Sequence, residues 1–291
     1  MRKSRVIATG MWLVLLTVAA SIGYGQGAND DNAGRKEPVG SALVYKTVDG
    51  RALHIYVSSP PASFTGPRPA IVFFHGGGWT SGSVVQFNTQ SLALAARGMV
   101  AIDVEYRLIP KPPAMDSPRI CVEDAKSAIR WVREHAEQLH VDPDKIVGSG
   151  GSAGGYLAGA AALVPEWNDP SDDLSVSAKP NALVLFFPAI AVDPSSPEER
   201  RFGGDMKLAP QTYLSAAAPP TIIFAGAADR LVRPEALRQY KAIADKAGSR
   251  CELIFYDKQG HGFANKEPYL SITLQAAEHF LESIGYLKPV G

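Results

Sequence analysis

One serine of this chain, Ser152, stands among glycines in the stretch GGSAG at residues 150–154. The pattern glycine-x-serine-x-glycine presents a nucleophilic serine on a sharp turn between a strand and a helix. A serine hydroxyl is a weak nucleophile by itself. It needs a neighbouring base, a group that orients the base, and N–H donors for the charge that develops on an attacked carbonyl oxygen. These three parts are sought elsewhere in the sequence.

Candidates for the base and for its orienting group follow the serine in chain order. Asp229 and His261 each come just after a short apolar segment that is typical of a strand. The carboxyl ends of parallel strands share one edge of a sheet, so these side chains can converge on Ser152. We therefore predict Ser152 as the nucleophile, His261 as the base and Asp229 as its orienting group. Asp257 is an alternative to Asp229, although we expect it at a strand end facing solvent.

The same glycines also fit a second pattern with unrelated chemistry. Gly148, Gly150 and Ala153 match a dinucleotide-binding fingerprint, in which a helix N-terminus approaches a pyrophosphate. That fingerprint expects an acidic residue about 20 positions later, at the end of the next strand. Aspartates occur at that distance, in residues 169–173, but they lie in a loop that contains proline and serine. The nucleophile interpretation is therefore favoured.

Other motifs support a hydrolase. The segments HGGGW (75–79), VEYRL (104–108), ADRL (228–231) and GHGF (260–263), together with the serine motif, resemble the hormone-sensitive-lipase-like branch of the α/β-hydrolases. They also resemble related secreted acetyl and feruloyl esterases. The resemblance covers about residues 68–285. It implies an oxyanion hole made by the backbone N–H groups of Gly77, Gly78 and Ala153.

The resemblance also has limits. The lipase-like branch usually carries aspartate before the serine, where this chain has Gly151, and it has an N-terminal helical cap that we do not expect here. Both departures favour the open-site carbohydrate esterases.

Trp79 and Phe263 are candidates for substrate binding, and each can equally be an aromatic residue packed beneath the loop. Arg107 is interpreted as a structural partner of Glu123 or Asp124.

The elements that must position these residues alternate between strand and helix. The predicted fold is α/β: an α/β-hydrolase with a doubly wound, mostly parallel sheet of about eight strands, helices on both faces, and no large N-terminal cap. Strands are expected at 42–48, 52–58, 70–74, 99–104, 145–149, 182–187, 221–225 and 251–256. Helices are expected near 88–96, 117–139, 153–163, 234–247 and 269–284.

The N-terminus has the layout of a secretory signal peptide. A basic start (MRKSR) precedes an apolar stretch at 6–22, and Gly23 and Gly25 stand before a cleavage point at Gln26. The predicted localisation is therefore secreted or periplasmic, with an uncleaved membrane anchor at residues 6–24 as the alternative. The predicted division is a signal peptide at 1–25, a flexible leader at 26–41 and a catalytic domain at 42–291.

The composition limits the partners. Lys+Arg and Asp+Glu both total 29, so the formal charge is zero and nothing favours nucleic acid or an anionic membrane surface as a partner.

Cys121 and Cys251 are predicted to be unpaired thiols. No histidine shows a metal-ligand pattern, and we expect neither a metal nor a cofactor.

Three functions follow for comparison. The leading hypothesis is a secreted serine carboxylesterase for short acyl esters of small molecules or saccharides, with acetyl and feruloyl groups as examples. The alternative keeps the triad and cleaves an amide, a formamide or a peptide. A non-catalytic binding protein on a hydrolase fold is disfavoured because Ser152, Asp229 and His261 are all present.

Overall fold

The computed structural model describes residues 37–110, 118–191 and 206–290. The predicted signal peptide and residues 26–36 of the predicted leader lie outside these described residues. Strand β1 (Ser41–Val48) begins one residue before the expected start of the catalytic domain, within the usual uncertainty of an element boundary. In the described part of the chain, no helix combines the length and the apolar character needed to cross a membrane.

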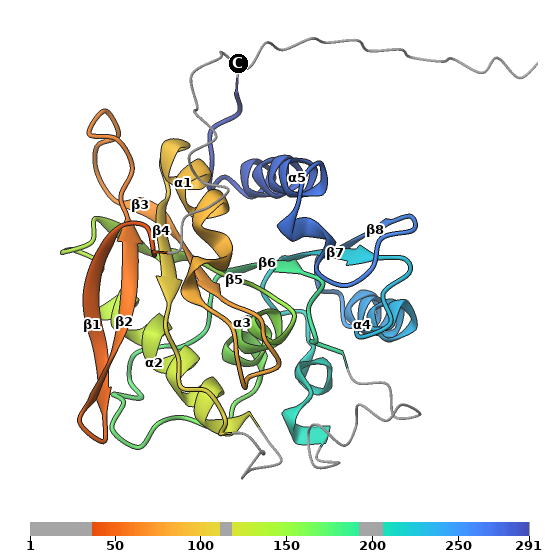
Figure 1. Ribbon diagram of the computed structural model, residues 1–291, viewed down its shortest axis with the longest axis horizontal. Helices are drawn as coiled ribbons and strands as arrows, with labels where there is room; N and C mark the ends of the chain where they lie inside the picture. The colour runs from red at the N-terminus through yellow and green to blue at the C-terminus, as the bar shows by residue number, and fades with distance from the viewer. Residues whose placement is uncertain (1–36, 111–117, 192–205, 291) are drawn as a thin grey trace, which may run out of the picture. The chain divides into compact units, whose positions relative to one another are not determined.

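The described chain builds one eight-stranded sheet with the order β1-β2-β4-β3-β5-β6-β7-β8 (Figure 1). The first two strands pair antiparallel, as do β2 and β4, and every later pair is parallel. This confirms the predicted, mostly parallel sheet. Beyond β1, the strands are β2 (Arg51–Ser58), β3 (Arg68–Phe74), β4 (Val100–Val104), β5 (Val141–Gly151), β6 (Ala182–Phe186), β7 (Thr221–Gly226) and β8 (Cys251–Tyr256).

Helices cover both faces of the sheet, again as predicted. One face carries α2 (Arg119–Glu134), α3 (Ala153–Leu163) and α4 (Pro234–Lys246), and the other carries α1 (Asn88–Ala96) and α5 (Tyr269–Ser283) (Figure 1). Helix α2 ends five residues before the predicted position 139. The chain instead turns through His140, whose φ is 54°, and Val141 N donates to Ala136 O, so that β5 can start.

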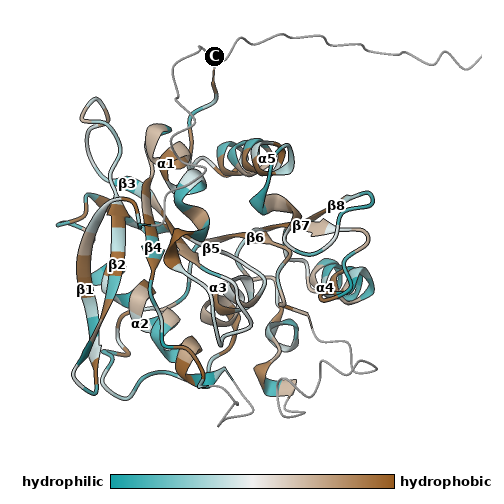
Figure 2. Cartoon of the chain, viewed as in Figure 1, coloured by the Kyte–Doolittle hydropathy of each residue, from teal (hydrophilic) through white to brown (hydrophobic). Residues whose placement is uncertain are grey.

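Strand β3 shows why the sequences of the central strands are unbroken runs of apolar residues. Ala70, Val72 and Phe74 belong to the core beneath α2, α3 and α4. Ile71 and Phe73 belong to the core beneath α1 and α5. Each of these side chains is almost completely buried, because both faces of the sheet are covered. Figure 2 shows the same brown, apolar colour along the central strands.

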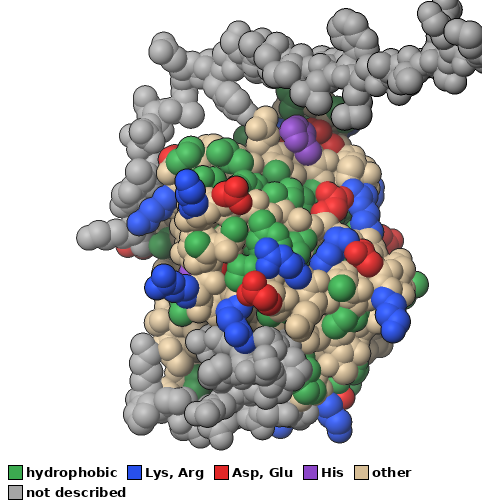
Figure 3. Space-filling model, turned by 90° about the vertical axis from the view of Figure 1, so that its right-hand side faces the viewer, with side chains coloured by type: hydrophobic (Ala, Val, Ile, Leu, Met, Phe, Trp, Pro, Cys, Tyr) green, Lys and Arg blue, Asp and Glu red, His purple; other side chains and the backbone are tan. Residues whose placement is uncertain are grey.

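The β8 edge of the sheet is partly covered by arginine side chains. The Arg238 guanidinium lies 4.6 Å from the centre of the Phe255 ring, and the Arg250 guanidinium lies 5.1 Å from the centre of the Phe280 ring. Figure 3, which views the molecule from this side, shows Lys and Arg side chains among the apolar ones. Basic side chains at a sheet edge disfavour pairing with another chain.

Both cysteines are buried and unpaired, as predicted. Burial raises the pKa of Cys121 and of Cys251 to about 12. A thiol is a nucleophile only as its thiolate, so neither side chain is suited to attack a substrate near neutral pH.

Ion pairs and a hydrogen bond tie the loop after α3 to helix α2 and to strand β1. Arg130 Nη1 lies 2.7 Å from Asp172 Oδ2, and Lys46 Nζ lies 2.6 Å from Asp169 Oδ2. Lys126 Nζ donates to the backbone oxygen of Val164 at 2.7 Å. The loop that contains these aspartates is therefore anchored to the body of the domain. Asp169 and Asp172, which lie at the distance where the dinucleotide pattern expects one acidic residue, are both held in ion pairs.

Arg107 occupies the structural position expected from the sequence. Its Nε and Nη2 each donate at 2.8 Å to Asp124, one to each carboxylate oxygen. Lys46 Nζ also reaches Asp124, whose side chain is completely buried. Asp124 of α2 therefore links Lys46 of β1 to Arg107, which follows β4. These contacts hold the backbone next to Tyr106 in place.

A buried carboxyl, Asp103 of β4, makes stability depend on pH. Its Oδ2 accepts a hydrogen bond from Ser91 Oγ at 2.7 Å, and Oδ1 has no hydrogen-bond partner among the described residues. Burial raises the pKa of Asp103 to about 7, against the lowering effect of the Ser91 bond. The unfolded carboxyl ionises near pH 4, so between about pH 4 and pH 7 the folded state binds more protons than the unfolded state. Stability from this group is therefore lost as pH rises through that range, and levels off above it.

Asp103→Asn is expected to remove this dependence. The unfolding free energy of the wild type should fall relative to that of the variant by on the order of 2 kcal/mol between pH 5 and pH 8. Urea denaturation across that range measures both slopes. Asp257→Asn, at an exposed position, should follow the wild type. Parallel curves for the wild type and Asp103→Asn would contradict the assignment.

Candidate active site

Ser152 occupies the turn between β5 and α3, in a backbone conformation that few side chains adopt. Its φ is 53° and its ψ is −118°. The turn is held from both sides, because Ser152 N donates to Phe186 O at 3.0 Å and Ser152 O accepts from Ala189 N at 3.0 Å. Such a strained, fixed turn is what lifts a nucleophilic side chain clear of the strand and the helix.

The glycines around Ser152 are required by the closeness of β3. An added Cβ at Gly154 would lie 1.9 Å from Phe74 O, and one at Gly150 would lie 2.5 Å from the same oxygen. Any side chain there would push the turn away from the sheet. The glycine-x-serine-x-glycine pattern thus has a local steric cause in this chain.

The structure brings the three predicted side chains together. His261 Nε2 lies 2.8 Å from Ser152 Oγ, and His261 Nδ1 lies 2.8 Å from Asp229 Oδ2. The three residues come from the carboxyl ends of β5, β7 and β8, which share one edge of the sheet. Asp257 is exposed, and the carboxylate that contacts His261 is that of Asp229.

Hydrogen bonds define the orientation of both His261 and Asp229. Asp229 Oδ1 accepts from Leu231 N at 2.8 Å and from Val232 N at 2.9 Å, which leaves Oδ2 for the imidazole. A carboxylate only accepts, so we assign the ring proton of His261 to Nδ1. The lone pair of Nε2 then faces the Ser152 hydroxyl, as proton removal from that hydroxyl requires.

Phe187 packs against the imidazole and was not singled out from the sequence. Its ring centre lies 5.0 Å from that of His261, with the planes at 69°. Its own φ is 37°, an unusual value for a bulky residue. The sequence signal was present, because the predicted strand ends in Phe-Phe-Pro. Only the structure shows that the second phenylalanine turns toward the histidine.

The glycine loop after β3 is supported by His75 and Tyr106. The Tyr106 hydroxyl donates to His75 O at 2.7 Å, and the two rings stack with centres 4.3 Å apart. His75 Nδ1 lies 2.7 Å from Gly76 O, to which it donates. Burial lowers the pKa of His75. His75 is therefore neutral near pH 7, and its role is to hold the glycine loop in place.

The main-chain donors of this loop stand beside the serine turn. Gly77 has φ 119°, and an added Cβ would lie 2.1 Å from Ser81 O, so only glycine fits. Among the described residues, the backbone N–H groups of Gly77 and Gly78 have no hydrogen-bond acceptor. Ala153 is the first residue of α3, where a helix leaves its N–H groups unpaired. An added Cβ at Gly76 would lie 3.4 Å from Ser152 Cβ, which places the loop against the turn.

Trp79 and Phe263 both lie in the packing around the site. Trp79 is 5% exposed and meets Tyr156 edge-on at 5.4 Å between ring centres. Phe263 is 8% exposed and packs against Tyr256 at 5.1 Å. A packing role is therefore visible for each, and contact with a substrate stays a prediction.

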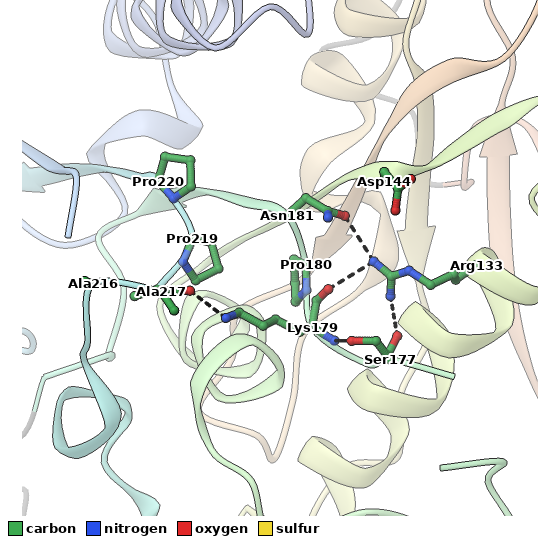
Figure 4. Close-up of a pocket in the computed structure, with 11 residues that line it drawn as sticks. Arg133, Asp144, Ser177, Lys179, Pro180, Asn181, Ala216, Ala217, Pro219 and Pro220 are labelled. Atoms are coloured by element: carbon green, nitrogen blue, oxygen red, sulfur yellow. Dashed lines mark hydrogen bonds between the residues drawn. The ribbon is translucent and has the colours of Figure 1, made fainter. Parts of the chain in front are cut away.

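A cleft of about 500 Å³ lies at the amino ends of β6 and β7, whereas Ser152 lies at the carboxyl ends of the strands (Figure 4). Its Arg133 donates to the oxygens of Pro143 at 3.1 Å and Lys179 at 3.0 Å, and to the Asn181 side chain at 3.1 Å. Lys179 Nζ donates to Ala217 O at 2.7 Å. These cations are engaged by the chain itself, and the cleft is remote from Ser152. Across the described ranges, no cluster of three or more His, Cys, Asp or Glu could hold a metal ion.

Comparisons with known proteins agree with this geometry. A family model named BD-FAE matches residues 53–191. LipM of Mycobacterium tuberculosis, a probable carboxylic ester hydrolase, is 30% identical over 214 residues, which is 66% of this chain and 48% of LipM. The esterase LipC of the same organism is 27% identical over 268 residues, which is 79% of this chain and 64% of LipC.

A solved structure extends the likeness over nearly the whole fold. The apo form of Thermogutta terrifontis esterase 2 is 41% identical, with a TM-score of 0.80 over 87% of this chain and 97% of that chain. The curated relatives are longer proteins. This chain spans about half the length of two of them, with 48% of LipM covered and 50% of a probable isoprenylcysteine alpha-carbonyl methylesterase of Arabidopsis thaliana. The near-complete cover of the solved esterase shows the family, and the chain belongs to the α/β-hydrolase superfamily, among the serine esterases of the hormone-sensitive-lipase-like kind.

Proposed function

We propose that this chain is a serine carboxylesterase that hydrolyses short-chain acyl esters. The observation that carries the proposal is the pair of 2.8 Å contacts that link Ser152 to His261 and His261 to Asp229. Solved forms of Thermogutta terrifontis esterase 2 with bound propionate and butyrate support short acyl groups by analogy.

The first half of the reaction forms an acyl-enzyme. Ser152 Oγ attacks the ester carbonyl carbon while its proton moves to His261 Nε2. The carbonyl π electrons move onto oxygen and give a tetrahedral oxyanion. When that intermediate collapses, the C–O bond to the alcohol breaks, and His261 gives its proton to the departing alcohol oxygen.

The second half releases the acid. Water attacks the acyl carbon and passes a proton to His261 Nε2, and the bond to Ser152 Oγ breaks as the proton returns to that oxygen. In both halves Asp229 stabilises the imidazolium through Nδ1. We assign the oxyanion to the N–H groups of Gly77, Gly78 and Ala153, each worth roughly 3–4 kcal/mol to the transition state.

The proposed alcohol is a saccharide, with acetyl or feruloyl groups as the acyl part. The support is the family resemblance, the BD-FAE match and the absence of a helical cap before β3 in the described residues. We also propose that the protein is exported, because residues 1–25 have the order of a signal peptide.

A substrate panel tests the proposal. We expect turnover of p-nitrophenyl acetate and butyrate, weaker turnover of the octanoate, and release of acetate from acetylated xylan. A fluorophosphonate probe should label Ser152, as peptide mass spectrometry would show. Assays of culture medium and cell extract from the same cells test export.

The panel also separates the alternatives. Formyl-kynurenine and aminoacyl anilides are the amide substrates. A higher kcat/KM on either of them than on every ester would replace the esterase by an amide hydrolase. Binding of esters without turnover or labelling would favour the non-catalytic alternative.

A further inference from the structure

Gln86 lies where three loops of the candidate site meet. It belongs to a short 3₁₀ helix (Val84–Phe87) that follows the glycine loop, and its side chain is partly buried. No motif of the sequence marks it. Its carboxamide has one acceptor and two donor hydrogens, so a single side chain can join two polar groups.

The two ends of the Gln86 amide hold different loops. Oε1 accepts a hydrogen bond from Gly76 N at 2.6 Å. Nε2 donates to Asn265 Oδ1 at 3.2 Å. Gly76 begins the loop whose next two N–H groups, those of Gly77 and Gly78, are the proposed oxyanion donors, and Asn265 stands four residues after His261. The amide thus bridges the loop of the proposed oxyanion donors and the loop of the base.

The nucleophile turn forms the third side of this contact. An added Cβ at Gly151 would lie 3.2 Å from Gln86 Nε2 and 3.0 Å from two atoms of the Phe187 ring. The space beside Gly151 is therefore filled by Gln86 and Phe187. This accounts for the departure noted in the sequence, where glycine stands in place of aspartate before the serine.

We propose that Gln86 is a positioning residue, which holds the glycine loop and the His261 loop at a fixed separation around Ser152. This inference rests on the esterase proposed above. Gln86 acts through Gly76 and Asn265, and it makes no contact with the reacting atoms in the proposed steps.

The expected defect is in the chemical step. Without the bridge, Gly76 N–H loses its acceptor, and the donors of Gly77 and Gly78 are no longer held to the position where the oxyanion forms. Donors of this kind act on charge that appears only in the transition state. Misplacement should therefore lower kcat and leave KM nearly unchanged. A loss of general packing would instead lower the melting temperature.

Gln86→Met tests the bridge, because methionine keeps the length of the side chain and removes both hydrogen bonds. We expect kcat for p-nitrophenyl acetate to fall by about 10- to 100-fold, with KM within about threefold. Asn265→Ala, at an exposed position, removes only the second hydrogen bond and should cost about 3- to 10-fold. Gln275→Met, the same change at an exposed site on α5, is the matched control and should equal the wild type.

The double variant tells positioning from packing. If both residues act through one bridge, adding Asn265→Ala to Gln86→Met should cost nothing more, with melting temperatures close to that of the wild type. A wild-type kcat in Gln86→Met overturns the inference, as does a kcat loss that follows the melting temperature in both variants. If Gln86→Met does not fold, Asn265→Ala decides alone, and a wild-type kcat overturns the inference. An inactive wild-type enzyme would instead refute the esterase proposal itself.

Discussion

Ser152→Ala is expected to lower kcat for p-nitrophenyl acetate by about 10⁵- to 10⁶-fold and to abolish labelling by a fluorophosphonate. The change removes the attacking oxygen and leaves the Cβ, so the turn keeps its conformation at φ 53°. The residual rate should still exceed that in water, because the main-chain donors remain. Steady-state kinetics on protein purified apart from any wild-type enzyme measures the loss.

The matched control is a serine of β5, the strand that leads to the Ser152 turn. Ser149 is buried three residues earlier, and its hydroxyl donates to Val184 O at 2.6 Å. Ser149→Ala loses that hydrogen bond, at a cost of about 1 kcal/mol of stability, and should keep both labelling and turnover. Turnover by folded Ser152→Ala at the wild-type rate would remove the basis of the proposed reaction.

Much of the fold follows from local patterns in the sequence. The Asp49-Gly50 turn has φ of 50° and 77°, as a two-residue hairpin turn requires, so the first two strands could be paired from sequence. An unbroken apolar run such as that of β3 is typical of a strand that is buried on both faces. The predicted end of α2, at residue 139, was wrong. The apolar pattern continues through Ala136 and Leu139, but these two side chains are buried in the turns that follow the helix.

The grouping of Ser152, Asp229 and His261 was predictable because it depends on topology. Each follows a parallel strand, and parallel strands end at one edge. Gln86 and Phe187 were not predictable in the same way. Their positions depend on how loops fold back over the turn, and no spacing in the sequence records that Gln86 would reach Asn265, 179 residues away. Likewise, only the ion pairs show that Asp169 is anchored to Lys46.

Asp229→Asn is expected to lower kcat by up to about 10⁴-fold while the protein stays folded. The reason lies in the two backbone donors on Oδ1. Leu231 N and Val232 N need an acceptor, so the asparagine oxygen should remain with them and its NH₂ should face His261. An NH₂ donor there favours the tautomer with the proton on Nε2. That nitrogen would then point a hydrogen at Ser152 and could not accept its proton.

Asp257→Asn provides the contrast, because Asp257 is the aspartate nearest to His261 in the chain and yet is exposed. Its kcat should equal that of the wild type. Kinetics of the two variants, with ¹⁵N NMR of the imidazole to identify the protonated nitrogen, separate the effect of a negative charge from that of the tautomer. If Asp229→Asn lost activity with the proton still on Nδ1, charge stabilisation of the imidazolium alone would account for the aspartate. If Asp257→Asn carried the larger loss, a different loop arrangement would have to act during turnover, with Asp257 behind the imidazole.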